Sequence, residues 1–169
     1  KADHFKDLFA ADLQDKQEKG MPKRSSIYIP QSCAQALGML CKPFTDKDDK
    51  KCPDAKYSEL LLKSWHDHKD AQTRNFSIMA LGWIGGELNR DALVKEFEKG
   101  GKDQQKPWCA LALGVYSFFK YEEDKKANKN IEIESYIAKT LASELKDTKN
   151  VSLTGALSIA LGRAQAKEE

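Results

Sequence analysis

The 169-residue chain lacks the features that mark several common classes of protein. It has no apolar run approaching the ~20 residues that a membrane-spanning helix needs. It also lacks a glycine-rich phosphate loop, a dinucleotide-binding fingerprint and a nucleophile elbow. Its net charge is only +2, from 28 basic and 26 acidic residues, which argues against nonspecific nucleic-acid binding as the main task.

Arginine and histidine are both scarce. The four arginines are Arg24, Arg74, Arg90 and Arg163, too few to favour bidentate recognition of phosphate or guanine. His4, His66 and His68 are the only histidines. His66 and His68 stand two residues apart, on roughly opposite sides of a helix, and so cannot chelate one metal ion together. We therefore expect no catalytic residue, metal ion or cofactor.

The repeated feature of the chain is the tripeptide Ala-Leu-Gly, which occurs four times. Its glycines are Gly38, Gly82, Gly114 and Gly162, and successive glycines stand 44, 32 and 48 residues apart. Spacings of this size are typical of stacked helical hairpins in which two of the connections carry insertions. We expect each tripeptide to lie on the first helix of one hairpin.

Residues around the tripeptide predict how these helices pack. The position four residues before each glycine holds Ala34, Ile78, Ala110 or Ser158. Positions three or four residues apart share one face of a helix. Glycine lets another backbone approach where any Cβ would clash. The pattern therefore predicts that a neighbouring helix comes close at these glycines.

The segment Arg74–Gly85, RNFSIMALGWIG, resembles the first helix of short bacterial HEAT-like repeats, R-x-x-A-x-x-A-L-G-x-I-G. It departs from that pattern at Ser77 and Ile78, where the family favours small alanines. The resemblance implies an all-α fold, a right-handed α–α superhelix of about four helical hairpins like those of HEAT and armadillo proteins. HEAT-like repeats serve as scaffolds, as parts of bilin lyases and as DNA-alkylation glycosylases, so the fold leaves function open.

The expected layout is one HEAT-like domain over residues 1–169. Its parts are a preceding or capping helix within 1–20, repeat 1 over 24–70 with an insertion at 42–56, repeat 2 over 71–101, repeat 3 over 102–149 with an insertion at 120–130, and the first helix of repeat 4 over 150–169. In the opening helix, the predicted apolar face consists of Phe5, Leu8, Phe9 and Leu13. Because the last helix has no second helix after it and the chain opens on Lys1, we expect a fragment of a longer chain.

Two groups of side chains are candidates for a chemical role. Cys33 and Cys109 occupy the same repeat position, among small residues, which predicts core packing rather than nucleophilic thiols. The aromatic residues Tyr116, Phe118, Phe119 and Tyr121 gather at a helix end. They form either core and a hinge to the second insertion or a stacking platform for a ligand.

The first insertion carries Asp46, Asp48 and Asp49, a spacing similar to that of a calcium loop. The central glycine and the closing glutamate of that loop are missing. We therefore interpret the insertion as a solvated loop.

These observations favour a non-catalytic scaffold for protein–protein interaction. The second helices are expected to present the partner-binding residues Lys95, Lys99, Lys139 and Glu144. The partner is another protein or a neighbouring domain of the parent chain, and nucleic acid is disfavoured. The alternative is an enzyme component, either lyase-like or of the alkylbase-glycosylase type. A basic concave groove with aromatics and a carboxylate would favour that alternative.

We predict a disulfide between Cys41 and Cys52, which bracket the charged part of the first insertion. Closing a loop of this length stabilises the fold by roughly 2–3 kcal/mol. The bridge requires an oxidising compartment and thus an exported protein, whereas reduced thiols fit the cytoplasm. Intact-mass measurement under denaturing conditions, with and without reductant, tests the bridge. The prediction fails if reduction does not add the mass of two hydrogens.

Overall fold

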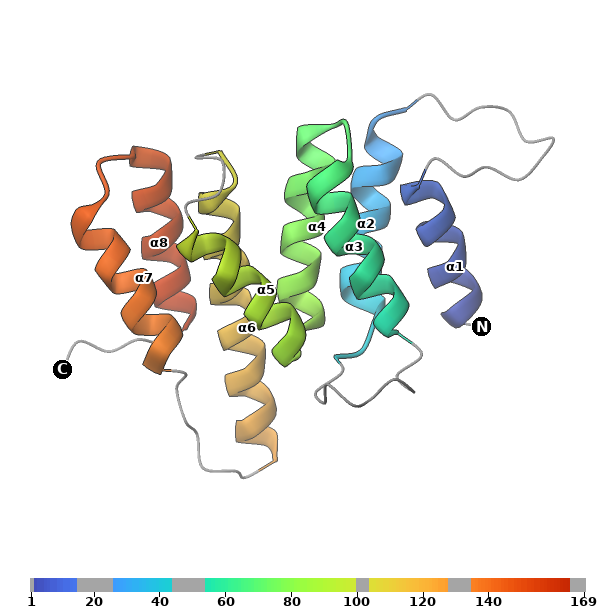
Figure 1. The fold of residues 1–169 in the computed structure, drawn as a ribbon. Helices are drawn as coiled ribbons and strands as arrows, with labels where there is room; N and C mark the ends of the chain where they lie inside the picture. The colour runs from blue at the N-terminus through green and yellow to red at the C-terminus, as the bar shows by residue number, and fades with distance from the viewer. Residues whose placement is uncertain (1, 15–25, 44–53, 100–103, 128–134, 165–169) are drawn as a thin grey trace.

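The computed structural model describes residues 2–14, 26–43, 54–99, 104–127 and 135–164, which contain eight α-helices and no strand (Figure 1). The helices are α1 (Ala2–Leu13), α2 (Tyr28–Leu40), α3 (Ala55–Asp67), α4 (Ala71–Ile84), α5 (Glu87–Glu98), α6 (Lys106–Lys126), α7 (Ser135–Asp147) and α8 (Val151–Arg163). The all-α class predicted from the sequence is confirmed. Within these ranges no helix is both long enough and apolar enough to cross a membrane.

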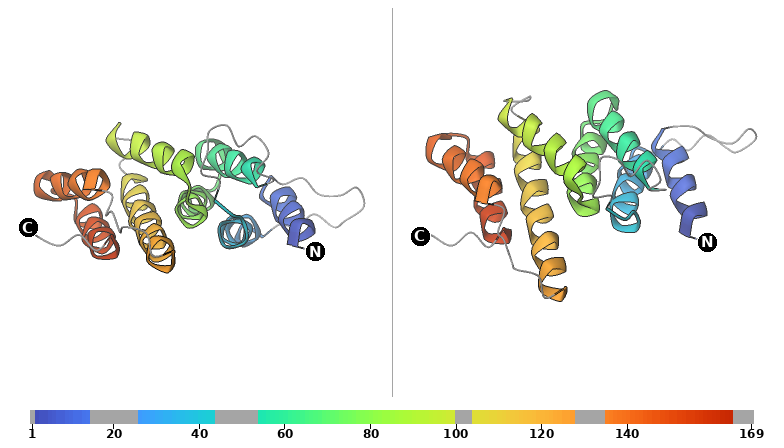
Figure 2. Two further views of the ribbon diagram at one scale, coloured as in Figure 1. Left: turned by 90° about the horizontal axis from the view of Figure 1, so that it is seen from below. Right: turned by 60° about the horizontal axis from the view of Figure 1, so that its bottom comes forward.

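The helices form two rows. Helices α2, α4, α6 and α8 lie side by side in chain order, and each contacts the next. Helices α3, α5 and α7 lie along one side of this row, and α1 lies against α2 at its N-terminal end (Figure 2). Each of α3, α5 and α7 packs on the even-numbered helix that follows it. Each helix of the second row therefore packs more on the helix that follows it than on the one that precedes it, across the expected repeat boundaries at 70–71, 101–102 and 149–150.

Glycines of the tripeptides bring the even-numbered helices into backbone contact. The distances from an added Cβ to the nearest atom are 2.8 Å for Gly38 to Ala80 Cα, 2.5 Å for Gly82 to Ala112 O and 2.5 Å for Gly114 to Ala160 Cα. Each value is too short for any real side chain. In each of these three cases the neighbouring atom belongs to the alanine of the next tripeptide, so the predicted close approach is confirmed at three of the four glycines and repeats in register. At Gly162, the fourth, the prediction is wrong, because α8 is the last helix of the row and a Cβ there has no atom within 4 Å.

The core fills the space between the two rows. Its largest fully buried side chains include Leu37, Leu81, Leu113, Trp65, Phe97 and Leu141. The first three are the leucines of the first three tripeptides, and the last three come from the second row. The buried face of α8, with Leu153 and Leu157, packs against α6 and α7.

The ends of α4 are set by local chemistry. Asp70 caps its N-terminus by accepting a hydrogen bond from the Thr73 backbone N–H at 2.7 Å. Gly85 and Gly86 end α4 and begin α5, with φ angles of +73° and +83°. L-residues with a side chain rarely adopt such angles, so glycine is required at this sharp reversal.

Helix α6 corrects the predicted second insertion. The insertion was expected to cover 120–130, but the helix continues to Lys126. An ion pair one turn apart, from Lys120 Nζ to Asp124 Oδ2 at 3.0 Å, supports the added turns. Lys125 and Lys126 also place positive charge at the negative end of the helix dipole.

Helix α1 corrects the predicted apolar face. Leu13 is buried as expected, but Phe5 is 53% exposed and Leu8 is 41% exposed. Lys6, a charged residue, is only 6% exposed. The apolar periodicity therefore predicts the helix correctly, but only part of the predicted apolar face is buried.

Changing Gly82 to alanine should destabilise the protein by about 2 kcal/mol, because the new methyl group would meet the Ala112 backbone of α6. The same change at Gly162 is the matched control, since a Cβ there has no atom within 4 Å. Alanine has the higher helix propensity, so Gly162→Ala should leave stability unchanged or raise it by about 0.5–1 kcal/mol. Urea denaturation followed by circular dichroism measures both changes. A Gly82→Ala protein as stable as the parent would contradict the close-packing account.

Candidate functional site

Three of the four predicted partner-binding residues are exposed on the second row. Lys95 and Lys99 lie one turn apart on the outer side of α5, and Lys139 lies on α7. Glu144 is only half exposed, and its Oε1 pairs with Lys106 Nζ at 2.7 Å. This glutamate is therefore engaged within the molecule, where it links α7 to the start of α6.

Lysines 95 and 99 border a shallow hollow of about 400 Å³ on α5. The described residues that line it are Asp91, Val94, Lys95, Glu98 and Lys99. Tyr136 of α7 donates its hydroxyl hydrogen to Glu98 at the edge of this hollow. Acidic and basic groups alternate here, so the hollow offers charges of both signs around one half-buried valine.

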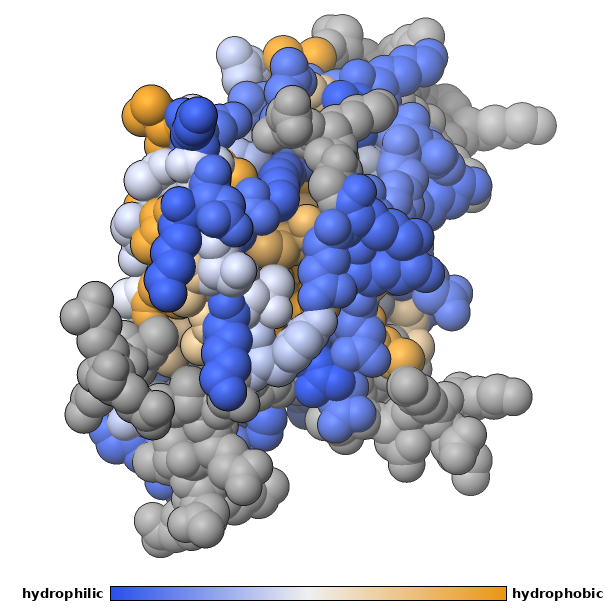
Figure 3. All heavy atoms as spheres, turned by 60° about the vertical axis from the view of Figure 1, so that its left-hand side comes forward, coloured by the Kyte–Doolittle hydropathy of each residue, from blue (hydrophilic) through white to orange (hydrophobic). Residues whose placement is uncertain are grey.

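Figure 3 shows the end of the molecule that α7 and α8 form. Hydrophilic side chains cover most of this face, and smaller hydrophobic patches lie along one edge and between the hydrophilic side chains. Val151 is 85% exposed and Ile159 is 59% exposed on α8. The visible face is thus polar and mixed rather than a large continuous apolar patch.

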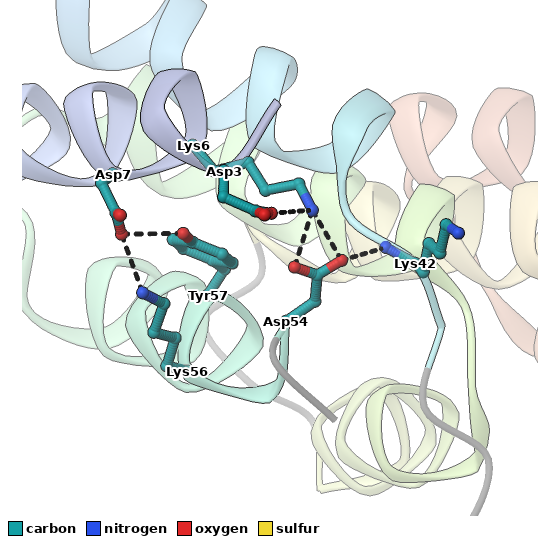
Figure 4. A network of polar contacts seen from close by, with 7 residues as sticks. All are labelled: Asp3, Lys6, Asp7, Lys42, Asp54, Lys56 and Tyr57. Atoms are coloured by element: carbon teal, nitrogen blue, oxygen red, sulfur yellow. Dashed lines mark hydrogen bonds and ion pairs between the residues drawn. The ribbon is translucent and has the colours of Figure 1, made fainter. Parts of the chain in front are cut away.

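A second polar cluster fastens α1 to the rest of the molecule (Figure 4). The Asp54 carboxylate is 3% exposed and accepts two hydrogen bonds from Lys6 Nζ, at 2.7 and 2.9 Å. It also accepts the Lys42 backbone N–H at 2.8 Å. Asp54 therefore joins three places at once: α1, the chain just after α2 and the start of α3.

The outer part of this cluster is exposed. Asp7 Oδ1 accepts hydrogen bonds from Lys56 Nζ and from the Tyr57 hydroxyl, both at 2.8 Å. These two hydrogen bonds lower the pKa of Asp7 below its usual value. Lys56 Nζ also lies 4.8 Å from the centre of the Tyr57 ring, a cation–π distance.

Lys6 is held in its charged form. Burial opposes the charge, but the hydrogen bond and the attraction to Asp54 outweigh it and raise the pKa of Lys6 above its usual value. A lysine that acts as a nucleophile needs its pKa lowered instead. The Lys6–Asp54 pair is therefore a structural contact, and Lys6 does not have the lowered pKa of a nucleophilic lysine.

Three cysteines of the described residues, Cys33, Cys41 and Cys109, are buried. Burial, with a smaller effect from the charge of Glu96, raises the pKa of Cys109 to about 12, so this thiol stays protonated at physiological pH. Cys33 is also buried, 5% exposed, at the same repeat position. Cys41 is buried, while Cys52 lies outside the described residues, so the disulfide between them stays a prediction.

Metal-binding groups do not gather in the part of the chain that the structure describes. No three histidine, cysteine, aspartate or glutamate side chains of that part lie close enough together to hold an ion. His68 accepts the Asp70 backbone N–H through Nδ1 at 3.1 Å, and His66 stacks on Trp65. The aspartates of the calcium-like segment, 46, 48 and 49, lie outside the described residues.

The aromatic cluster at the end of α6 divides between two environments. Tyr116 and Phe119 line a pocket of about 320 Å³ between the end of α4, the start of α5 and α6. Phe118 instead faces Arg163 at 5.2 Å, and Tyr121 faces Lys125 at 5.9 Å. The sequence indicated Tyr116 and Phe119 of this pocket, but not Trp83 and Glu87, because α4 and α5 bring these two residues to it.

Comparison of the chain with protein-family models, curated proteins and solved structures gives no match. The resemblance to HEAT-like repeats therefore rests on the sequence alone, on the segment Arg74–Gly85 and the repeated tripeptide.

Replacing Lys6 by methionine should destabilise the fold by about 3 kcal/mol, because Asp54 would keep a buried charge without its ion-pair partner. Lys56→Met is the matched control. It removes a lysine from the same helix contact, but from a pair whose side chains are 60% and 59% exposed. It should change stability little. Urea denaturation of both variants provides the comparison, and equal effects would contradict the assigned role of the buried pair.

The Lys6 contribution should also depend on pH. Its folded-state pKa is raised, so the stabilisation is fully present below the unfolded-state pKa and is lost as pH rises through the folded-state value. The stability difference between the parent and Lys6→Met should therefore be constant near neutral pH and shrink above the ordinary lysine value of 10.5. A difference that persists unchanged at higher pH would contradict the ionic origin of the effect.

Proposed function

We propose that this chain is a non-catalytic scaffold for protein–protein interaction, built as a HEAT-like right-handed superhelix of stacked helical hairpins. The observation that carries the proposal is the glycine–alanine contact repeated in register along the even-numbered helices. Contacts of this kind hold successive helices at one short spacing, which gives a rigid row. The second row then presents its outer side chains at set positions for an extended partner.

The outer chemistry of the second row supports recognition rather than catalysis. Lys95 and Lys99 stand beside Asp91 and Glu98 in one hollow. Exposed charges of both signs favour an association of modest affinity that weakens as salt is raised. The partner is another protein or a neighbouring domain of the same parent chain.

The enzyme alternative receives less support from the same surfaces. A glycosylase-type component would need a basic groove to hold a phosphate backbone. The hollow on α5 is mixed in charge, and carboxylates outnumber lysines in the pocket beside α6. Lys6, Asp54 and Cys109 are buried, and Lys6 and Asp54 pair with each other.

A charge-reversal pull-down tests this proposal. The chain is used as bait, and the double variant Lys95→Glu with Lys99→Glu should retain its partner several-fold less well than the parent. Lys125→Glu with Lys126→Glu is the matched control, because it reverses the same charge on exposed lysines at the end of α6. Binding that is equal in the parent and both variants would exclude the α5 face as the interface. Turnover of a nucleobase or bilin substrate by the purified chain would contradict the scaffold role itself.

A further inference from the structure

The pocket beside α6 combines aromatic rings with excess carboxylate. Its described lining residues are Pro43, Trp83, Ile84, Gly85, Gly86, Glu87, Tyr116, Phe119, Lys120, Glu123, Asp124 and Ala127. Those from α6 recur at intervals of three and four residues, so they form one stripe of that helix. The volume of about 320 Å³ is at the small end of the range for ligand pockets and suits a single side chain or a small molecule.

One wall of the pocket is backbone that only glycine can form. Gly85 and Gly86 combine positive φ angles with ψ angles of −156° and 153°. The Gly85 carbonyl accepts a hydrogen bond from Asn89 Nδ2 at 2.9 Å, and buried Asn89 also donates to Ser58 Oγ at 3.1 Å. The turn is thus anchored to α5 and α3. Because both residues of this turn are glycines, no side chain of the turn fills the pocket. The atoms nearest to a Cβ added at Gly85 would be those of Pro43 and Tyr116, both at 3.9 Å.

Three aromatic residues supply the apolar lining. Tyr116 is buried, Trp83 is half buried and Phe119 is 44% exposed at the mouth. The faces of such rings carry partial negative charge and attract cations. Tryptophan, the strongest of the three in this respect, comes from α4, while the other two come from α6.

The charged lining is acidic. It contains three carboxylates, Glu87, Glu123 and Asp124, and one ammonium group, Lys120. Lys120 pairs with Asp124 at 3.0 Å, and this neutralises one of the three. Glu87 and Glu123 are exposed, and neither forms an ion pair with another described residue. Two negative charges therefore stand beside the rings without a counter-charge among these residues.

The N-terminus of α5, which lies at this pocket, does not make the pocket favour an anion. A helix N-terminus favours an anion through its free N–H groups. Here Glu87 already occupies the first turn of α5. An added anion would have to approach this carboxylate and Glu123 together, which Coulomb repulsion opposes.

We propose that this pocket binds an organic cation, an ammonium or guanidinium group on an aliphatic stem. The stem would contact Trp83 and Phe119, and the cationic head would meet Glu87 and Glu123. Two sources of this chemistry are a lysine or arginine side chain of a peptide and a free polyamine. The inference is independent of the proposed scaffold role, because a small cation can be tested alone and the pocket does not include Lys95 or Lys99.

Titration of the ¹⁵N-labelled chain tests the proposal by NMR. The probes are N-acetyl-lysine methylamide, its neutral counterpart N-acetyl-norleucine methylamide, and spermidine, all at constant ionic strength. We expect saturable shifts of the Trp83 indole N–H and of the Gly85 and Gly86 amides with a cation, and none with the norleucine compound. Binding of the lysine compound identifies a peptide side chain as the source, and binding of spermidine alone identifies a polyamine.

Two variants separate the pocket from general surface charge. Glu87→Gln combined with Glu123→Gln should weaken cation binding about three- to tenfold, from the loss of two exposed ionic contacts. Glu122→Gln is the matched control, since this neighbour on α6 does not line the pocket, and it should leave binding unchanged. The proposal is overturned if neither cation shifts these resonances, if the norleucine compound shifts them equally, or if the double variant binds as well as the parent. The scaffold proposal would be unaffected by any of these results.

Discussion

The close contact between glycine and alanine on neighbouring helices is the constraint on which the rest of the structure depends. At Gly38, Gly82 and Gly114 the next helix comes so near that a Cβ would lie 2.5–2.8 Å from it. Helices at this spacing leave room between the rows for leucines and for one layer of larger side chains from α3, α5 and α7. The second row is therefore positioned by the first. The exposed face of the second row holds the proposed interaction surface. The glycine–alanine contacts that fix the position of this face involve none of its residues.

Polar contacts hold α1 in place, beyond the end of the glycine–alanine packing. At the N-terminal end α1 has no tripeptide, and the buried Asp54 carboxylate joins it to the connection between α2 and α3. Such a pair is costly to bury and more costly to break, because either partner left alone keeps an unpaired charge. Asp54 therefore makes the position of α1 specific. The exposed pair of Lys56 and Asp7 lies beside it and adds little of its own.

The two surfaces considered for binding differ in chemistry for a structural reason. The hollow on α5 lies on the outside of the second row, where one helix supplies both signs of charge in alternation. The pocket beside α6 lies where one helix ends, a glycine turn reverses the chain and a longer helix passes. Three segments contribute to it, so rings and carboxylates that are distant in sequence meet. A shallow surface of mixed charge suits a protein partner, and a deeper acidic pocket with aromatic walls suits a single cationic group.

The sequence by itself determined the helical class, the helices that carry the tripeptides and the close contact at three of their four glycines. These features depend on interactions within one or two helical turns, or on the absence of a Cβ, and both can be read locally. Only the tertiary structure decided that Lys6 is buried while Phe5 is exposed, because the partner of Lys6 is Asp54, 48 residues away. It also decided that Glu144 is engaged by Lys106 and that Glu87 and Glu123 share a pocket with Trp83. Such pairings depend on how whole helices pack, and no periodicity within a single segment specifies them.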